Sequence, residues 1–377
     1  MLQHYWWLVV SLLGALLVFL LFVQGGQTLL FGTAKTEDEK SLLVNAFGHK
    51  WELTFTTLVT FGGAMFASFP LYYSTSFGGA YWLWITILLL FVIQAVSYEF
   101  RNKAGNLLGK RSYEFFLFLN GSLGTIFLGI AVGTFFTGGN FVMDKMEITN
   151  IAKPVISYWI NSWHGLDAAV VPFNILLGIG VFLAARTLGL MYVIGNIDNA
   201  ELIERSRIKV KITGSAFVVG FVGILIFLSM LTGYSVDRES GFISAVEHKY
   251  LLNFLQLKWP VIMLLAGVVL VLSGMTMIFL KRDKNSFYVT GGGVVLAVWS
   301  LLIVAAFNNT AFFPSNVDAQ YSLTLYNSSS SEFTLKTMAV VSVLIPFVLA
   351  YIVYAWREMT KKKISTEELE DPNSIKY

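Results

Sequence analysis

The sequence predicts an all-α polytopic membrane protein. Of its 377 residues, 56% are hydrophobic and only 13% are charged, which is too little polar surface to cover a soluble globule of this size. Long apolar stretches recur along the whole chain, and the basic residues gather in alternate connections between them. These observations together favour a bundle of membrane-spanning helices without a soluble domain.

Nine stretches meet the requirement for crossing a bilayer, which is about 20 apolar residues for a core about 30 Å thick. They cover residues 6–29, 53–75, 80–98, 113–136, 164–188, 212–235, 259–280, 286–307 and 337–357. The first stretch follows MLQHY, which lacks the basic segment of a secretory signal, so we expect it to remain as a spanning helix. We therefore predict one transmembrane domain over residues 1–363 and a C-terminal tail over residues 364–377.

The basic residues predict the orientation, since Lys and Arg are retained on the cytoplasmic side of a membrane. One set of alternate connections holds 20 of the 26 Lys and Arg residues. This set includes the loop before residue 53 and the segment after residue 357. The N-terminus is therefore predicted outside and the C-terminus in the cytoplasm.

Two acidic residues flank the second and third predicted helices. Glu52 begins one helix and Glu99 ends the next, and the midpoint between them falls in the turn STSFGG at residues 74–79. Residues equidistant from the turn of an antiparallel hairpin lie at the same depth, so both acids are predicted near the cytoplasmic edge. An acid within the bilayer costs about 2.5–3.5 kcal/mol at the centre and less toward the ends. The alternative role is an interfacial anchor, for which Arg101 beside Glu99 would supply an ion pair.

Glu52 lies on a stripe of polar and small residues at helical spacing. The stripe continues through Thr56 and Thr60 to Gly63 and Ala67. Its small end would let another helix approach closely, and its polar end would support a chain of hydroxyls and water that carries protons inward. The alternative is that the threonine hydroxyls bond to carbonyls of their own helix.

Several kinds of chemistry are not expected in this chain. Cysteine is absent, which excludes disulfides and thiolate metal sites. The four histidines fall near the predicted ends of helices without ligand spacing, so neither haem nor metal is expected. The formal net charge is only +3, and the basic residues are scattered over the loops, so nucleic acid is not an expected partner.

Four motifs in order resemble one family. They are WELTFTTLVTFGGAMFASFP at residues 51–70, SYEFRNK at 97–103, PFNILLG at 172–178 and the segment at 321–351. Together they resemble subunit II of cytochrome bd-type quinol oxidases, in which a Trp-acid start, a glycine-rich core, a proline and an acid-aromatic-Arg signature recur.

The resemblance implies nine transmembrane helices arranged as two four-helix bundles plus one peripheral helix, in a bacterial cytoplasmic (inner) membrane. It implies a homologous subunit I as partner, which carries haems b and d and oxidises quinol while dioxygen is reduced to water. This chain would bind no haem. The resemblance leaves open whether a small third subunit is present and whether a structural quinone or membrane lipid binds to this chain.

The resemblance also implies roles for individual residues. Trp51 and Glu52 match the Trp-acid pair, and Glu99 matches the acid before the aromatic-Arg pair. Glu52 and Glu99, with Thr56 and Thr60, would belong to a route that takes protons from the cytoplasm toward haem d in the partner.

The chain also departs from the family pattern. Gln24 and Gln27 stand where many members have carboxylates, and Gln94 stands where many have an arginine. The proton path is therefore expected to differ in detail.

Two other interpretations fit nine helices with acids at their edges. One is a polytopic secondary transporter with intramembrane acidic residues, which should show broken helices that meet at mid-depth. The other is an assembly subunit whose glutamates take no part in chemistry.

Overall fold

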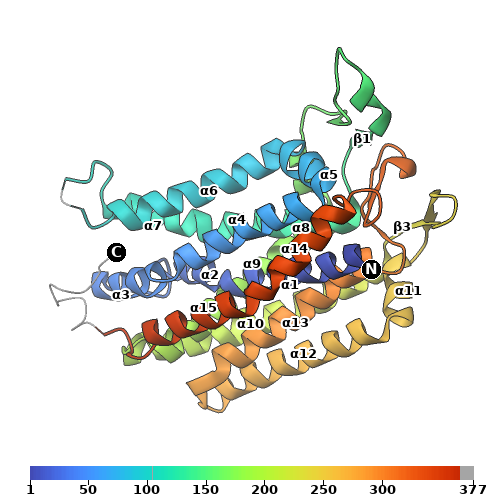
Figure 1. The fold of residues 1–377 in the computed structure, drawn as a ribbon. Helices are drawn as coiled ribbons and strands as arrows, with labels where there is room; N and C mark the ends of the chain where they lie inside the picture. Colours follow the sequence, from blue (N-terminus) through green and yellow to red (C-terminus); the bar gives the residue numbers. More distant parts are fainter. Residues whose placement is uncertain (104, 366–377) are drawn as a thin grey trace.

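The structure of the protein is a computed structural model, and it describes residues 1–103 and 105–365. Long helices run side by side along one direction, with short sheets at one end of the bundle and the loop before α7 at the other (Figure 1). Within the described residues, eight helical segments are long and apolar enough to cross a bilayer. They are Leu2–Gln27, Tyr81–Phe100 (α6), Lys110–Thr137, Pro172–Asn196 (α9), Ala200–Met230 (α10), Lys258–Phe279 (α12), Ser286–Ala306 (α13) and Glu332–Met359. Three of these segments consist of several elements: the first of α1 (Leu2–Leu20) and α2 (Phe22–Gln27), and the third of α7 (Lys110–Leu119), η2 (Asn120–Gly124) and α8 (Thr125–Thr137). The last consists of α14 (Glu332–Val341), η7 (Ser342–Leu344) and α15 (Ile345–Met359).

The segment predicted as a helix over residues 53–75 forms α4, Trp51–Ser68. It is 18 residues long, and it is not among the eight apolar spans of the described chain because its acid, threonines and glycines lower its hydropathy. The helix ends at Phe69, and α5 (Pro70–Tyr73) and the π-helix η1 (Ser74–Gly78) lead into α6. The all-helical class is thus confirmed, and eight of the nine predicted spans are apolar enough by this measure.

Two predicted helix boundaries were wrong. The helix predicted from residue 164 begins at Pro172, because His164 and Gly165 have positive φ angles and the 3-10 helix η4 (Leu166–Val170) follows them. Proline at the first helical position needs no hydrogen-bonded N–H. The helix predicted from residue 212 begins instead at Ala200, where the Asn199 side chain caps the backbone N–H of Leu202. Its first turns are charged, so a search for apolar stretches misses them.

Two short helices outside the spans were not predicted. The first, α3 (Glu37–Gly48), begins with a capping box in which Thr36 and Glu39 each satisfy the other's backbone N–H. The second, α11 (Lys249–Gln256), follows His248 at the opposite end of the bundle. The described residues contain five 3-10 helices: η4 and η7, given above, and η3 (Lys145–Thr149), η5 (Asp283–Asn285) and η6 (Ala319–Tyr321).

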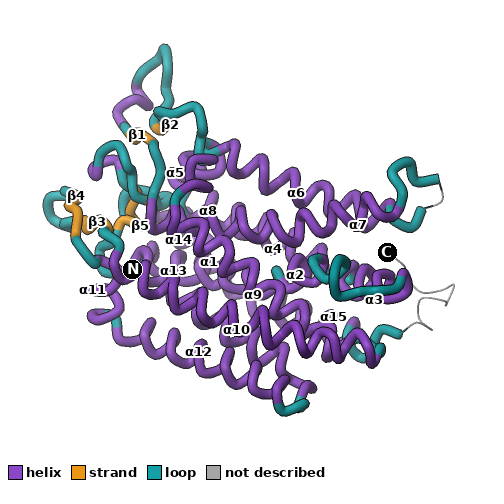
Figure 2. The backbone as a smooth tube through the Cα atoms, turned by 180° about the vertical axis from the view of Figure 1, so that it is seen from behind, coloured by secondary structure: helices purple, strands orange, loops and turns teal. Residues whose placement is uncertain are grey.

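Three small antiparallel sheets lie in the long connections at one end of the bundle (Figure 2). They pair β1 (Phe141–Met143) with β2 (Ser157–Trp159), β3 (Gly233–Val236) with β4 (Ile243–Val246), and β5 (Ala311–Phe313) with β6 (Leu323–Thr324). The Trp159 indole donates a 2.8 Å hydrogen bond to the backbone carbonyl of Thr75, which ties β2 to the α4–α6 turn. These connections therefore cap the bundle without forming a separate domain.

Glycines allow the closest helix contacts. A Cβ placed on Gly129 of α8 would lie 2.6 Å from the Cα of Gly178 in α9. A Cβ on Gly293 of α13 would lie 2.6 Å from the backbone oxygen of Gly267 in α12. Small residues at such positions let backbones approach and gain dispersion energy, which replaces the hydrophobic drive that is absent between helices in lipid.

A buried ionic cluster joins α3, α6 and α7 near one end of the bundle. The Arg101 side chain is fully buried and donates to Glu114 Oε1 from Nε at 3.2 Å and from Nη2 at 2.8 Å. Lys40 Nζ lies 3.1 Å from the other oxygen of Glu114. Arg205 of α10 pairs with Glu39, so the same end is tied to a fourth helix. Each charge has an opposite partner, which buried charges require.

We predict that Arg101→Met destabilises the protein by about 3–5 kcal/mol, because Glu114 then keeps a buried charge with only Lys40 opposite it. The matched control is Lys103→Met, which removes an exposed lysine from the same end of α6 and should cost less than about 1 kcal/mol. Thermal unfolding of the purified protein in detergent measures both. Equal effects of the two substitutions would contradict the structural role assigned to Arg101.

Candidate functional site

The α4–α6 hairpin brings the two predicted acids to one end of the bundle. The rings of Trp51 and Tyr98 stack with centroids 6.0 Å apart and an interplanar angle of 16°. Glu52 and Glu99 are the next residues along the chain. Phe55 lies one turn further along α4 and Phe91 about two turns back along α6, with ring centroids also 6.0 Å apart. The geometry therefore agrees with the predicted matching depth of the acids.

The stripe that begins at Glu52 faces outward from this chain. Glu52, Thr56, Thr60 and Gly63 are all exposed, and Ala67 is half-buried. A Cβ on Gly63 would meet no atom within 4 Å. The small residues of the stripe were predicted to admit another helix. Within the described residues, no helix of this chain packs against Gly63.

The threonine hydroxyls do not form a continuous chain within this protein. Thr60 donates a 2.7 Å hydrogen bond to the backbone oxygen of Thr56, and Thr57 donates one of the same length to Leu53. This bonding to the own helix is the alternative that the sequence left open, and it holds for Thr60. A proton-conducting chain along the stripe would need water or groups from outside this chain.

The ion pair between Glu99 and Arg101, which belonged to the alternative role as an interfacial anchor, is not formed. Glu99 pairs with Lys103 one turn later, and their side chains are 60% and 52% exposed. Arg101 turns into the protein, where it binds Glu114. The reason is direction: the two residues are two positions apart on a helix, so their side chains do not face each other. Glu99 is consequently accessible at the edge of the hairpin.

Behind the stacked rings lies a group of buried amides. Gln24 of α2 donates a 3.0 Å hydrogen bond to Gln94 of α6, and Gln27 donates one of 3.1 Å to the hydroxyl of Tyr98. Asn120 is fully buried at the start of the π-helix η2. Its neighbour Gly121 packs against Gln24, because a Cβ there would lie 2.4 Å from the Gln24 backbone oxygen. We refer to Gln24, Gln27, Gln94 and Asn120 as the amide group.

The amide group has unused hydrogen-bonding capacity. Among the described residues, no partner is found for Gln24 Oε1, Gln27 Oε1, Gln94 Nε2 or either side-chain polar atom of Asn120. Trp51 Nε1 is likewise buried without a partner. Buried polar atoms of this kind are usually satisfied by water. The group is neutral, so it can orient water but cannot supply an exchangeable carboxyl proton.

The sequence analysis identified neither Asn120 as a member of this group nor Tyr98 as the hydrogen-bond acceptor of Gln27. A signal was present, since Gln24, Gln27, Gln94 and Asn120 are amides within otherwise apolar runs. Such residues face the interior of a bundle and one another. Trp51 and Tyr98 lie between the amide group and the exposed acid Glu52. The predicted site therefore has a buried polar part, which the depth and helical spacing of the acids and threonines did not reveal.

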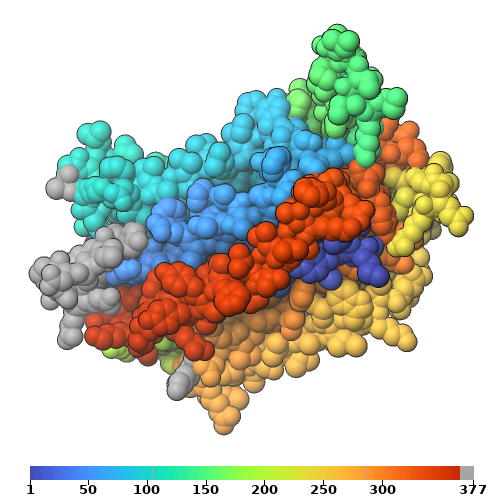
Figure 3. All heavy atoms as spheres, viewed as in Figure 1, coloured from blue at the N-terminus to red at the C-terminus, as the bar shows by residue number. Residues whose placement is uncertain are grey.

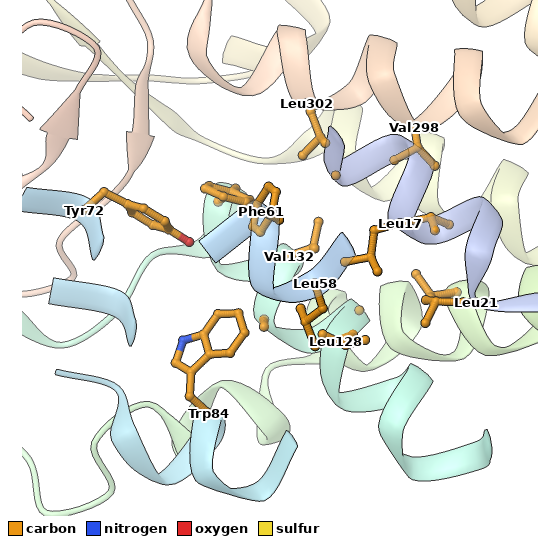
Figure 4. A pocket seen from close by; sticks show the side chains of 16 residues that line it. Leu17, Leu21, Leu58, Phe61, Tyr72, Trp84, Leu128, Val132, Val298 and Leu302 are labelled. Atoms are coloured by element: carbon orange, nitrogen blue, oxygen red, sulfur yellow. The ribbon is translucent and has the colours of Figure 1, made fainter. Parts of the chain in front are cut away.

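A small apolar cavity lies further along the same hairpin. It has a volume of about 40 Å³ and is lined by side chains of α1, α4, α6 and α8, among them Leu17, Phe61, Trp84 and Leu128 (Figure 4). An apolar cavity of this size stays dry. The polar region at the hairpin end therefore does not continue along its interior face. Within the described residues, no three His, Cys, Asp or Glu side chains form a group that could hold a metal ion.

The chain is similar to known proteins over nearly its whole length. The family model of cytochrome bd terminal oxidase subunit II matches residues 2–359. Cytochrome bd ubiquinol oxidase subunit 2 of Bacillus subtilis is 26% identical over 88% of this chain and 87% of that protein. Cytochrome bd-I ubiquinol oxidase subunit 2 of Escherichia coli is 24% identical over 98% of this chain and 97% of that protein.

A solved structure shares the fold. The structure of bd oxidase from Geobacillus thermodenitrificans includes a chain that matches with a TM-score of 0.63 and 12% identity, over 95% of this chain and 98% of that one. The family model covers far more than half of the sequence, and the relatives align from end to end. The chain therefore belongs to the cytochrome bd terminal oxidase subunit II family.

Proposed function

We propose that this chain is the non-haem subunit of a quinol-oxidising terminal oxidase, and that it supports the haem-bearing subunit and supplies a cytoplasmic entry for protons. Haems b and d, quinol oxidation and dioxygen reduction belong to the partner in this proposal. The family membership supports the assembly. The single observation that carries the proton-entry role is the exposed polar stripe of α4, which runs from Glu52 to Gly63.

The stripe is the proposed contact with the partner. An acid, two threonines and a glycine facing hydrocarbon would be unfavourable, because lipid offers no hydrogen bonds and a glycine offers little contact area. A helix of a second chain packed at Gly63 would cover the face and bring its own polar groups to the threonines. α4 then serves as the ninth spanning helix, buried in the complex although it is exposed in this chain.

The proposal includes the bundle arrangement and the membrane orientation that were expected from the sequence. Two four-helix bundles with α14–α15 as the peripheral helix would account for the ridge that these helices form across one face of the molecule (Figure 3). The N-terminus lies outside and the C-terminus in the cytoplasm, which places Glu52 and Glu99 at the inner edge. A structural quinone or lipid and a small third subunit remain compatible with this arrangement.

The proton step assigned to this chain is short. The carboxyl group of Glu52 takes up a proton from the cytoplasm and passes it to water held at the junction of α4 with the partner. Glu99, exposed at the same depth, replenishes it from the inner surface. Trp51 holds the start of α4 against Tyr98 and so fixes the position of Glu52. The neutral amide group orients water behind this pair without a charge of its own.

The transporter interpretation is not favoured. It requires a substrate site near mid-depth between broken helices, whereas the acids lie at one end of the hairpin and the family is that of an oxidase subunit. An assembly subunit with idle glutamates is the remaining alternative, and substitution of Glu52 separates it from the proposal.

Glu52→Gln should slow quinol-driven oxygen consumption at least about tenfold, because positioned groups that transfer protons contribute about 10²–10⁴-fold. Haem spectra and subunit stoichiometry should be unchanged, since glutamine preserves shape and hydrogen bonding. Glu52→Asp is the matched control, and it should retain more activity because it keeps the carboxyl group. Wild-type turnover of Glu52→Gln across pH 6 to 9 would leave Glu52 as an anchor only.

Gly63→Leu should reduce the yield of assembled complex at least several-fold, because a branched side chain would separate α4 from the partner helix. Gly223→Leu is the matched control, since a Cβ on Gly223 in α10 also meets no atom within 4 Å. Co-purification of the haem-bearing subunit with each variant measures assembly. If both variants assemble equally well, the partner does not pack at Gly63.

Reporter fusions after Ser74 and Ser328 should read as outside, and fusions after Lys110 and Lys363 should read as cytoplasmic. The reason is the distribution of basic residues over alternate connections. A cytoplasmic reading at Ser328 would overturn the assignment of α4 as a ninth span or that of the C-terminal helix.

A further inference from the structure

A long apolar groove separates the C-terminal helix from the rest of the bundle. It has a volume of about 630 Å³ and lies between α15, α1 and α4, with Tyr288 of α13 at its floor. This volume is within the range of about 300–1,000 Å³ that holds a single bound ligand. Figure 3 shows α15 as a ridge over this part of the surface, and all of its described apolar residues except Ala355 and Trp356 are exposed.

The groove is somewhat shorter than one bilayer leaflet. It runs from Leu13 to Leu20 on α1 and from Leu349 to Arg357 on α15. At a rise of 1.5 Å per residue these segments span about 10 and 12 Å. Half of a hydrocarbon core about 30 Å thick is about 15 Å. An acyl chain of one leaflet would therefore lie along the groove without crossing the midplane.

One end of the groove carries positive charge. Arg357 lines this end, its side chain is exposed, and it makes no ion pair within the described part of the chain. The Trp356 indole beside it donates a 3.1 Å hydrogen bond to the Tyr288 hydroxyl. Aromatic side chains of this kind lie at the level of lipid headgroups.

A second cation lies at the same tryptophan. Lys50 is 1% exposed, and its ammonium nitrogen lies 5.2 Å from the Trp356 ring centroid. Within the described residues this nitrogen has no hydrogen-bond partner. Burial lowers the pKa of Lys50 to about 8, so it remains mostly protonated at neutral pH. A buried ammonium group without an acceptor requires an anion or water that this chain does not provide.

We propose that the groove between α1, α4 and α15 binds one anionic phospholipid of the cytoplasmic leaflet, with its phosphate at Arg357 and an acyl chain along the apolar walls. Lys50 does not line the groove, and its charge acts on the phosphate from beside the Trp356 ring. Basic pockets between transmembrane helices on the cytoplasmic side recognise anionic headgroups. The bound lipid would fix α15, which otherwise packs loosely against the bundle. A neutral quinone would match the apolar walls but would leave both cations unpaired.

The test measures lipid preference in the assembled, delipidated oxidase complex. Phosphatidylglycerol and phosphatidylcholine with the same fluorescent acyl chain are titrated in detergent. The wild type should bind phosphatidylglycerol at least about tenfold more tightly. A cation near a membrane surface contributes about a fivefold factor, so Arg357→Gln should reduce the preference about fivefold. Lys50→Met removes a buried charge that does not line the groove and should reduce the preference less, and the double variant should nearly abolish it.

The matched control is Lys361→Gln, which removes a charge from the same end of α15. Lys361 pairs with Glu358 and does not line the groove, so the preference should change less than twofold. Val353→Trp fills the groove with both cations intact, and it should weaken the binding of both lipids.

Equal binding of the two lipids by the wild type would overturn the proposal, as would an unchanged preference in the double variant or retention of a quinone in place of phospholipid. Loss of the partner subunit in Arg357→Gln would show that a protein chain fills the groove. These readouts do not depend on oxygen consumption, so they are separate from the test of Glu52.

Discussion

The structure is governed by the need of every polar side chain in a hydrocarbon layer to find a partner. Arg101, Glu114 and Lys40 satisfy this need within the chain by forming a buried ionic cluster that joins three helices. Gln24 and Gln94 satisfy part of it by pairing with each other. The same rule identifies the functional surfaces, because the polar groups that remain unsatisfied indicate what must come from outside.

Besides the amide group, which water can satisfy, two such sets stand out among the described residues, and they call for different partners. The stripe of α4 combines an acid with threonines and an open glycine, which suits a neighbouring helix that brings polar groups and water. The groove at α15 combines apolar walls with Arg357 at one end and the buried Lys50 beside Trp356, which suits an anionic lipid. Both lie against α4, so the complex would surround this short helix with protein on one side and lipid on the other. Its low hydropathy is compatible with spanning the membrane only in such surroundings.

The sequence predicted the helical class and most spans, since apolar runs of bilayer length are a strong and local signal. It missed the charged first turns of α10 and the capped helix α3, because neither has the composition of a span. The matched depth of Glu52 and Glu99 followed from the symmetry of a hairpin. The ion-pair partner of Arg101 could not be predicted in the same way. Glu114 lies on another helix, and the pairing depends on the direction in which the Arg101 side chain turns. The amide group was visible as single polar residues, but only the fold brings Gln24, Gln94 and Asn120 to one place.

The central claim is that the partner subunit covers the polar stripe of α4. Phe66 lies on this face of α4, with 59% of its surface exposed in this chain. Replacing it with the photoreactive analogue p-benzoylphenylalanine changes its size little, and the same replacement at Phe279 of α12, which is 45% exposed, provides the comparison. Illumination of membranes should crosslink position 66 to the haem-bearing subunit and leave position 279 without this product. Crosslinking of position 66 to lipid alone would contradict the account, because the stripe would then face the bilayer in the assembled complex.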